Sequence, residues 1–221
     1  MAALDPATLR AHYSEFLEPR GAPRRILLTG HSHQAWPDVA RRGLDEAFRV
    51  AAERVDDKWD AVFAAQDELR AHVAARIGGH ADESAFGSST HELLVRFLSA
   101  LPLAERPHVV TTTGEFHSAY RQLRRLGEDL LDVTFVEAEP VSTLAERLAS
   151  ATTERTSAVV VSTVLFGTST VVPGLETLVG AARGLGAEVL LDAYHAFDVL
   201  PFRVPDGAFL VAGGYKDAQW G

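Results

Sequence analysis

The 221-residue sequence contains no cysteine. This absence excludes disulfide bonds, thiolate catalysis and every cysteine-ligated metal or iron–sulfur site. The sequence also lacks any apolar run of membrane-spanning length, and the stretch from Met1 to Arg25 is polar and charged, without the apolar core of a signal peptide. We therefore expect a cytoplasmic protein with no membrane partner.

Basic residues are in the minority, because 21 lysines and arginines stand against 30 acidic residues, for a net charge of −9. This balance argues against nucleic acid as a partner, while a local cationic pocket for a phosphate or carboxylate is compatible with it. The dinucleotide-binding glycine fingerprint, the Walker lysine motif and the His-Glu-x-x-His motif are all missing. His31 and His33 have no third ligand nearby, so we expect no metal site.

The hydropathy pattern predicts two helices followed by an alternation of strands and helices. The helices run from Pro37 to about Ala52 and from Lys58 to Ile77, where two glycines end the second one. Short runs rich in β-branched residues predict five strands, at His108–Thr113, Val133–Val136, Ser157–Thr163, Glu188–Asp192 and Ala208–Ala212. A helical stretch, Leu175–Leu185, lies between the third and fourth of these runs.

The apolar runs Ala158–Val161 and Val189–Leu191 lack the alternation of a half-exposed strand. Strands of this kind are covered on both faces, so the pattern predicts an α/β fold with a mostly parallel sheet between two helical layers. No repeat, low-complexity tract or linker divides the chain. Ligands of such sheets bind at the carboxyl ends of the strands.

A carboxylate and an amine follow two successive predicted strands: Asp192 ends one, and Lys216 comes just after the next. Both groups are therefore expected at the same edge of the sheet. Pyridoxal phosphate (PLP) needs a lysine for its Schiff base and an acid that keeps the pyridine nitrogen protonated. Taken singly, Asp192 could be a helix cap and Lys216 a solvated loop lysine.

The pattern Asp-x-x-His at 192–195, followed some twenty residues later by Tyr-Lys at 215–216, resembles the kynureninase-like, class V aminotransferase branch of the fold type I PLP enzymes. The resemblance implies that Lys216 forms the Schiff base and that Asp192 pairs with the pyridine nitrogen. It further implies that His195 lies beside the ring as an orienting or proton-relay group, and that Tyr215 binds the phosphate.

Small hydroxyl residues precede an apolar helical stretch within Gly87–Leu94. The free amides and the dipole of a helix N-terminus favour a phosphate, and the hydroxyls add donors. The resemblance implies that Ser88, Ser89 and Thr90 form the phosphate cup of the family. By themselves, Ser89 and Glu92 also match an ordinary capping box.

The segment Gly114–Ser118 follows the run His108–Thr113, where an aromatic side chain can stack on a bound ring. The resemblance places Phe116 over the pyridine face; the alternative is a place in the core. Ser162, near the end of the run Ser157–Thr163, and Thr168, in the loop after it, are expected to approach the cofactor's ring, although the loop 165–172 departs from the family form.

The resemblance covers about residues 25–221 and implies two parts, an N-terminal segment 1–36 near the substrate mouth and a PLP-binding large domain 37–221 that is incomplete at its C-terminus. In the family a C-terminal small domain supplies the arginine for the substrate carboxylate, and the resemblance implies that this chain does not include that domain. We therefore expect pairing with a continuation of the chain or a complementary polypeptide, and assembly as a dimer.

Two functional readings follow. In the first, the chain is a PLP enzyme that acts on an amino acid, as a kynureninase-like hydrolase or as a class V aminotransferase, and the sequence does not separate these reactions. In the second, it is a PLP-binding half-subunit or a non-catalytic subunit that needs a partner polypeptide for activity.

Overall fold

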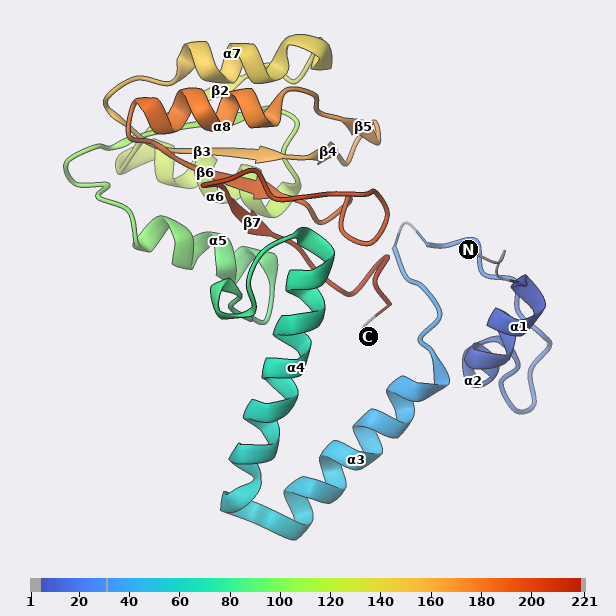
Figure 1. Ribbon diagram of the computed structural model, residues 1–221. Helices are drawn as coiled ribbons and strands as arrows, with labels where there is room; N and C mark the ends of the chain where they lie inside the picture. Colours follow the sequence, from blue (N-terminus) through green and yellow to red (C-terminus); the bar gives the residue numbers. More distant parts are fainter. Residues whose placement is uncertain (1–4, 31, 220–221) are drawn as a thin grey trace. The chain divides into compact units, whose positions relative to one another are not determined.

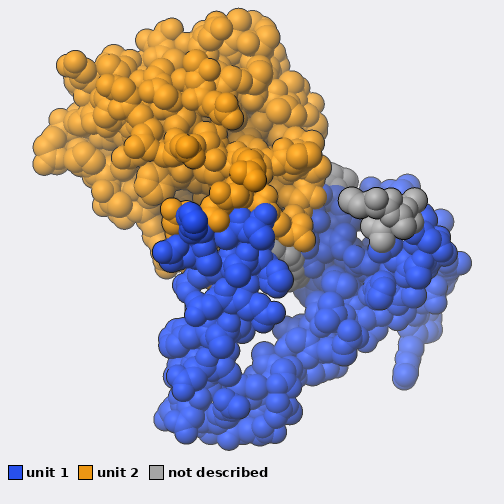
Figure 2. Space-filling model, in the orientation of Figure 1, with its two compact units in different colours: residues 1–75, 80–82, 214–221 blue, residues 76–79, 83–213 orange. Residues whose placement is uncertain are grey.

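The computed structural model describes residues 5–30 and 32–219. Two compact units divide the chain (Figure 2). Unit 1 comprises residues 1–75, 80–82 and 214–221, and unit 2 comprises residues 76–79 and 83–213. The expected boundary at residue 36 concerns function and stays a prediction.

Unit 2 is built on a five-stranded sheet in the order β2-β1-β3-β6-β7, and all four strand pairs are parallel. The strands are β1 (His108–Thr112), β2 (Asp132–Val136), β3 (Thr156–Ser162), β6 (Glu188–Asp192) and β7 (Phe209–Val211). A two-stranded antiparallel hairpin, β4 (Val164–Leu165) with β5 (Thr170–Val171), follows β3. The predicted α/β class with a mostly parallel sheet is confirmed.

Helices cover both faces of this sheet (Figure 1). One face carries α5 (Thr90–Ser99) and α6 (His117–Asp129), and the other carries α7 (Leu144–Ala151) and α8 (Leu175–Gly184). Leu94 and Leu123 pack with Val160 on the first face, whereas Leu148 packs with Val161 on the second. Successive residues of β3 therefore enter different cores, which explains why its sequence shows no polar alternation.

The strand order has a switch point between β1 and β3. From β1 the chain crosses through α6 to β2 on one side, whereas β3 lies on the other side of β1 and continues toward β6 and β7. A crevice forms outside the carboxyl ends of strands where the connections diverge in this way, and ligands of open α/β sheets bind there. The residues after β1 and at the end of β3 therefore border the expected site.

Unit 1 is helical, with α1 (Pro6–Arg10), α2 (Ser14–Leu17), α3 (Asp38–Arg54) and α4 (Trp59–Ile77), and with short 3-10 turns at Ala11–Tyr13, Val55–Lys58 and Ala81–Glu83. The last residues of α4 and of the third turn belong to unit 2. The two predicted helices correspond to α3 and α4, with ends shifted by one or two residues. Among the helices in the described part of the chain, none combines the length and apolarity needed to cross a membrane.

Aromatic rings gather where the ends of unit 1 meet. Phe16, His33 and Trp36 lie with their ring centroids 5.7–5.9 Å apart, and Tyr215 meets His33 edge-on at 5.5 Å. The Tyr13 hydroxyl donates to Gln219 Oε1 at 2.6 Å. The segment that carries Lys216 is thus held to the N-terminal segment. His31, the neighbour of this cluster in the sequence, lies outside the described residues.

Candidate cofactor site

Asp192 is the last residue of β6, and the local backbone fixes its carboxylate. The Tyr194 N–H donates to Asp192 Oδ1 at 2.9 Å, an Asx-type turn that forms because the strand ends there. Asp192 is paired in register with Ser162 of β3. Since Val160 and Leu190, two residues earlier, enter the core beneath α5 and α6, Ser162 and Asp192 face the same layer.

A group of rings lies in the loops at this edge of the sheet and is called here the aromatic cluster: Phe116, His117, Phe166, Tyr194 and His195. Phe116 meets Phe166 edge-on at 5.3 Å and lies 6.4 Å from the ring of His195. The structure thus brings together Phe116 and His195, which the resemblance placed over the face of one pyridine ring and beside that ring. Phe166 and His117, whose rings are 5.1 Å apart, were not predicted.

The N-terminus of α5 holds the predicted phosphate cup. Ser89 caps the helix, because its Oγ accepts the Glu92 N–H at 3.2 Å. The Glu92 carboxylate accepts both the N–H and the hydroxyl of Ser88, at 2.7 and 2.6 Å. These bonds, first of all the one from the Ser88 hydroxyl, lower the pKa of Glu92. The Glu92 carboxylate therefore already accepts the Ser88 donors of the predicted cup. Thr90 is the first residue of the helix.

Glu115, in the loop after β1, is a further residue that the sequence did not single out. It is 2 % exposed, and its two carboxylate oxygens accept the backbone N–H and the hydroxyl of Ser162, at 2.9 and 2.6 Å. Burial raises the pKa of Glu115 to about 8, and the nearby charge of Asp192 acts in the same direction, against the two hydrogen bonds. Burial therefore favours the protonated form of Glu115.

The remaining predicted residues lie in three places. Ser162 is buried and engaged with Glu115, while Thr168 is exposed in the loop between β4 and β5. Tyr215 and Lys216 belong to unit 1, whereas Asp192 and His195 belong to unit 2. The roles assigned to these residues, and the pairing of Lys216 with Asp192 around one cofactor, stay predictions.

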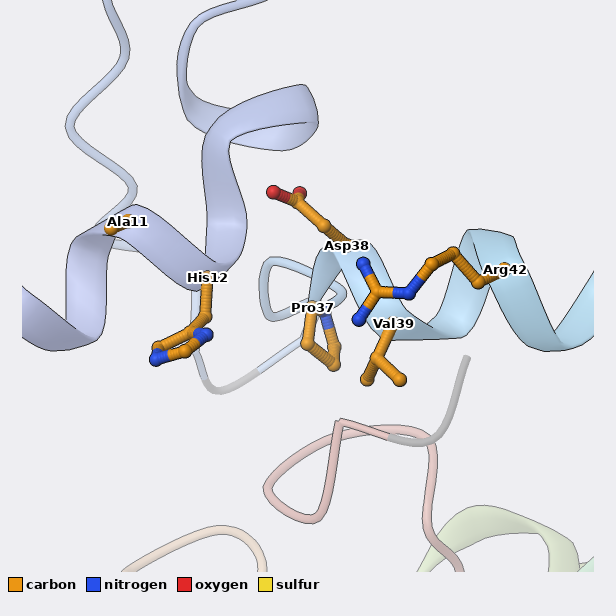
Figure 3. Close-up of a pocket in the computed structure, with 6 residues that line it drawn as sticks. All are labelled: Ala11, His12, Pro37, Asp38, Val39 and Arg42. Atoms are coloured by element: carbon orange, nitrogen blue, oxygen red, sulfur yellow. The ribbon is translucent and has the colours of Figure 1, made fainter.

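A hollow in unit 1 lies apart from all of these residues in the sequence. Ala11, His12, Pro37, Asp38, Val39 and Arg42 line it (Figure 3). The carboxylate of Asp38 accepts the backbone N–H and the hydroxyl of Ser14 and the N–H of Glu15, and these bonds lower its pKa. Asp38 thus ties the start of α2 to α3, which gives this hollow a structural explanation. Within the described residues no cluster of three potential metal ligands occurs.

Comparison with solved structures identifies the architecture. A cysteine desulfurase from Thermococcus onnurineus NA1 superposes with a TM-score of 0.76 at 22% identity, over 99% of this chain and 56% of that one. The cysteine desulfurase CsdA from Escherichia coli gives 0.72 at 15% identity, over 97% and 55%. A C-DES variant with glycine covalently linked to its PLP cofactor gives 0.77 at 14% identity, over 97% and 56%.

The fold is that of the large domain of fold type I PLP enzymes. The chain spans about half the length of the solved chains that it matches. No family model and no curated protein sequence matches it. At these identities the likeness concerns the fold, so the chemistry is argued from the residues of this chain.

Proposed function

We propose that this chain binds PLP and forms the cofactor-holding part of an enzyme that acts on an amino acid. The observation that carries the proposal is that one compact unit contains Asp192, the aromatic cluster and the N-terminus of α5. All three belong to unit 2, and Asp192 faces the sheet layer that α5 covers. They offer an acid, flat apolar rings and anion-binding amides, which are the groups that a phosphorylated pyridine requires.

The phosphate cup fits the group in its chemistry. The amide and hydroxyl of Ser88 hold a carboxylate oxygen of Glu92 at hydrogen-bond distance, so these donors accommodate an anionic oxygen. The Glu92 side chain is partly exposed and is paired with Arg96 at 2.5 Å. It can therefore turn away from Ser88 toward Arg96 when a phosphate takes its place.

Each remaining residue has a definite task in this proposal. Lys216 would attach the cofactor covalently, and Asp192, ionised and held by the Tyr194 amide, would keep the pyridine nitrogen protonated. Phe116 would cover one ring face and His195 would lie beside the ring. When bound, PLP supplies an electron sink for the bond that breaks at the substrate's α-carbon. The Lys216 amine, once released, would take the proton from that carbon.

Three reactions share these first requirements. Transamination and hydrolytic Cβ–Cγ cleavage follow from the sequence resemblance, and removal of sulfur from cysteine is suggested by the desulfurase neighbours. The choice among them depends on how the substrate's side chain and carboxylate are bound. We propose that a continuation of the chain or a complementary polypeptide supplies this binding, and that the complete unit forms a dimer.

The proposal is tested by titrating the chain with PLP. We expect a visible absorbance band that saturates at one PLP per chain and that Asp192→Asn shifts without abolishing. Amino donors, kynurenine and cysteine should then be compared as substrates of the chain alone and of the chain with its complementary part. A chain that develops no band at saturating PLP, although it is folded by circular dichroism, would contradict the proposal.

A further inference from the structure

Glu115 connects the two strands that border the switch point of the sheet. It follows β1, and both of its carboxylate oxygens bind Ser162, the last residue of β3, at 2.9 and 2.6 Å. Ligands bind in this crevice in open α/β sheets. A buried carboxylic acid is costly to place there, since apolar residues could join the two strands without desolvating a polar group. The position therefore points to a role beyond packing.

Glu115 is also linked to Asp192 through Ser162. Ser162 lies in register with Asp192, and both side chains face the layer of α5 and α6. Among the described residues, Asp192 on β6 is the charged group that acts on Glu115, and Ser162 on β3 provides its two hydrogen bonds. Two neighbouring carboxyls do not ionise together without a large cost. A protonated Glu115 therefore leaves the negative charge to Asp192.

We propose that Glu115 is a positioning residue of the cofactor site. It fixes the end of β3 at Ser162, and it leaves Asp192 as the ionised member of this pair of acids. This inference rests on the proposed function, because Asp192 matters in this way only if it meets the pyridine nitrogen. The coupling between the two acids, however, is a property of the chain without cofactor. It can be measured separately.

The first experiment follows the carboxyl carbons of Glu115 and Asp192 by NMR in the ¹³C-labelled chain without PLP, as a function of pH. We expect Glu115 to titrate far above an ordinary glutamate, and Asp192→Asn to lower its midpoint by about half a pH unit or more. Glu115→Gln should leave the midpoint of Asp192 close to its wild-type value, because Glu115 is still uncharged where Asp192 ionises. A purely structural role of Glu115 would leave its midpoint unchanged in Asp192→Asn.

The second experiment measures PLP affinity by absorbance. Glu115→Gln keeps the size and the neutral hydrogen-bonding character of the protonated acid, so its affinity should stay within about threefold of the wild type. Glu115→Ala leaves the Ser162 amide and hydroxyl without their partner and should weaken PLP binding by about tenfold or more. Glu137→Ala, which removes an exposed glutamate in the neighbouring loop after β2, is the matched control and should have no effect.

The outcomes separate the inference from the proposed function. If the wild-type chain does not bind PLP, the proposed function fails and the positioning role falls with it. If it binds PLP but Glu115 titrates as an ordinary glutamate, or its midpoint ignores Asp192→Asn, the inference alone is overturned. Should Glu115→Ala fail to fold, the titration of the wild-type and Asp192→Asn chains, which both keep Glu115, still decides the question.

Discussion

As the pH rises, the free energy of unfolding of Glu115→Gln should increase relative to that of the wild type. The carboxyl of Glu115 has its pKa raised from 4.5 to about 8 by burial. Between these two values the folded chain keeps a proton that the unfolded chain has lost. The free energy of unfolding of the wild type therefore decreases as the pH increases through this window, whereas an amide at the same position does not titrate.

The size of the effect follows from the shift. Each pH unit inside the window corresponds to about 1.4 kcal/mol. Between about pH 6 and about pH 9 the wild type should lose about 3 kcal/mol relative to Glu115→Gln, because the loss stops once the folded carboxyl has ionised. Near pH 6 the two proteins should differ by about 1 kcal/mol or less, since the amide oxygen can still accept the Ser162 N–H.

The assay is urea unfolding at several pH values, followed by far-UV circular dichroism. Tryptophan fluorescence is less suitable, because Trp36 and Trp59 belong to unit 1 and Glu115 to unit 2. Glu105→Gln, at an exposed glutamate of unit 2, is the control and should follow the pH profile of the wild type. Parallel profiles for Glu115→Gln and the wild type would refute the claim that a buried, protonated acid joins β1 to β3.

Three further results are expected. Asp192→Asn should retain PLP but lower turnover by about 30- to 100-fold, the equivalent of about 2–3 kcal/mol of lost charge-assisted bonding, and near-normal turnover would count against its role. Glu92→Gln should bind PLP several-fold more tightly, because the side chain that competes with the phosphate for the Ser88 donors then carries no charge. Unchanged or weaker binding would show that the Ser88 donors do not bind the phosphate. Light scattering after size-exclusion chromatography should find the chain associated, since Leu44, Phe48 and other apolar side chains of α3 and α4 are more than half exposed; a stable, active monomer would exclude this.

The layered fold could be predicted because its physical signals are local. Valine-rich runs such as Val159–Val161 enter two cores at once, and this leaves a continuous apolar stretch in the sequence. Proline at the start of α3 and glycine after α4 marked helix ends within two residues. The hairpin of β4 and β5 was missed because strands of two residues each are too short to show a period.

Residues of the candidate site could be predicted only where a side chain suited to bind the cofactor stands at the end of a strand or the start of a helix. Asp192 at the end of β6 and Ser89 at the start of α5 are such cases. Glu115 gave no signal, because a glutamate in a loop is usually solvated. It is buried here through a contact with Ser162, 47 residues away, that depends on strand order. Glu92 likewise matched the capping-box pattern, but its carboxylate binds Ser88 rather than the N-cap residue.

The covalent attachment of PLP to Lys216 is the central claim, and borohydride reduction tests it most directly. The chain is loaded with PLP, reduced, digested and examined by mass spectrometry. We expect one pyridoxyl adduct on the peptide that contains Lys216, and loss of both the adduct and the visible band in Lys216→Ala. Lys58, the chain's other lysine, serves as the control, and Lys58→Ala should label as the wild type does. A reducible adduct that persists in Lys216→Ala would contradict the attachment of PLP to Lys216.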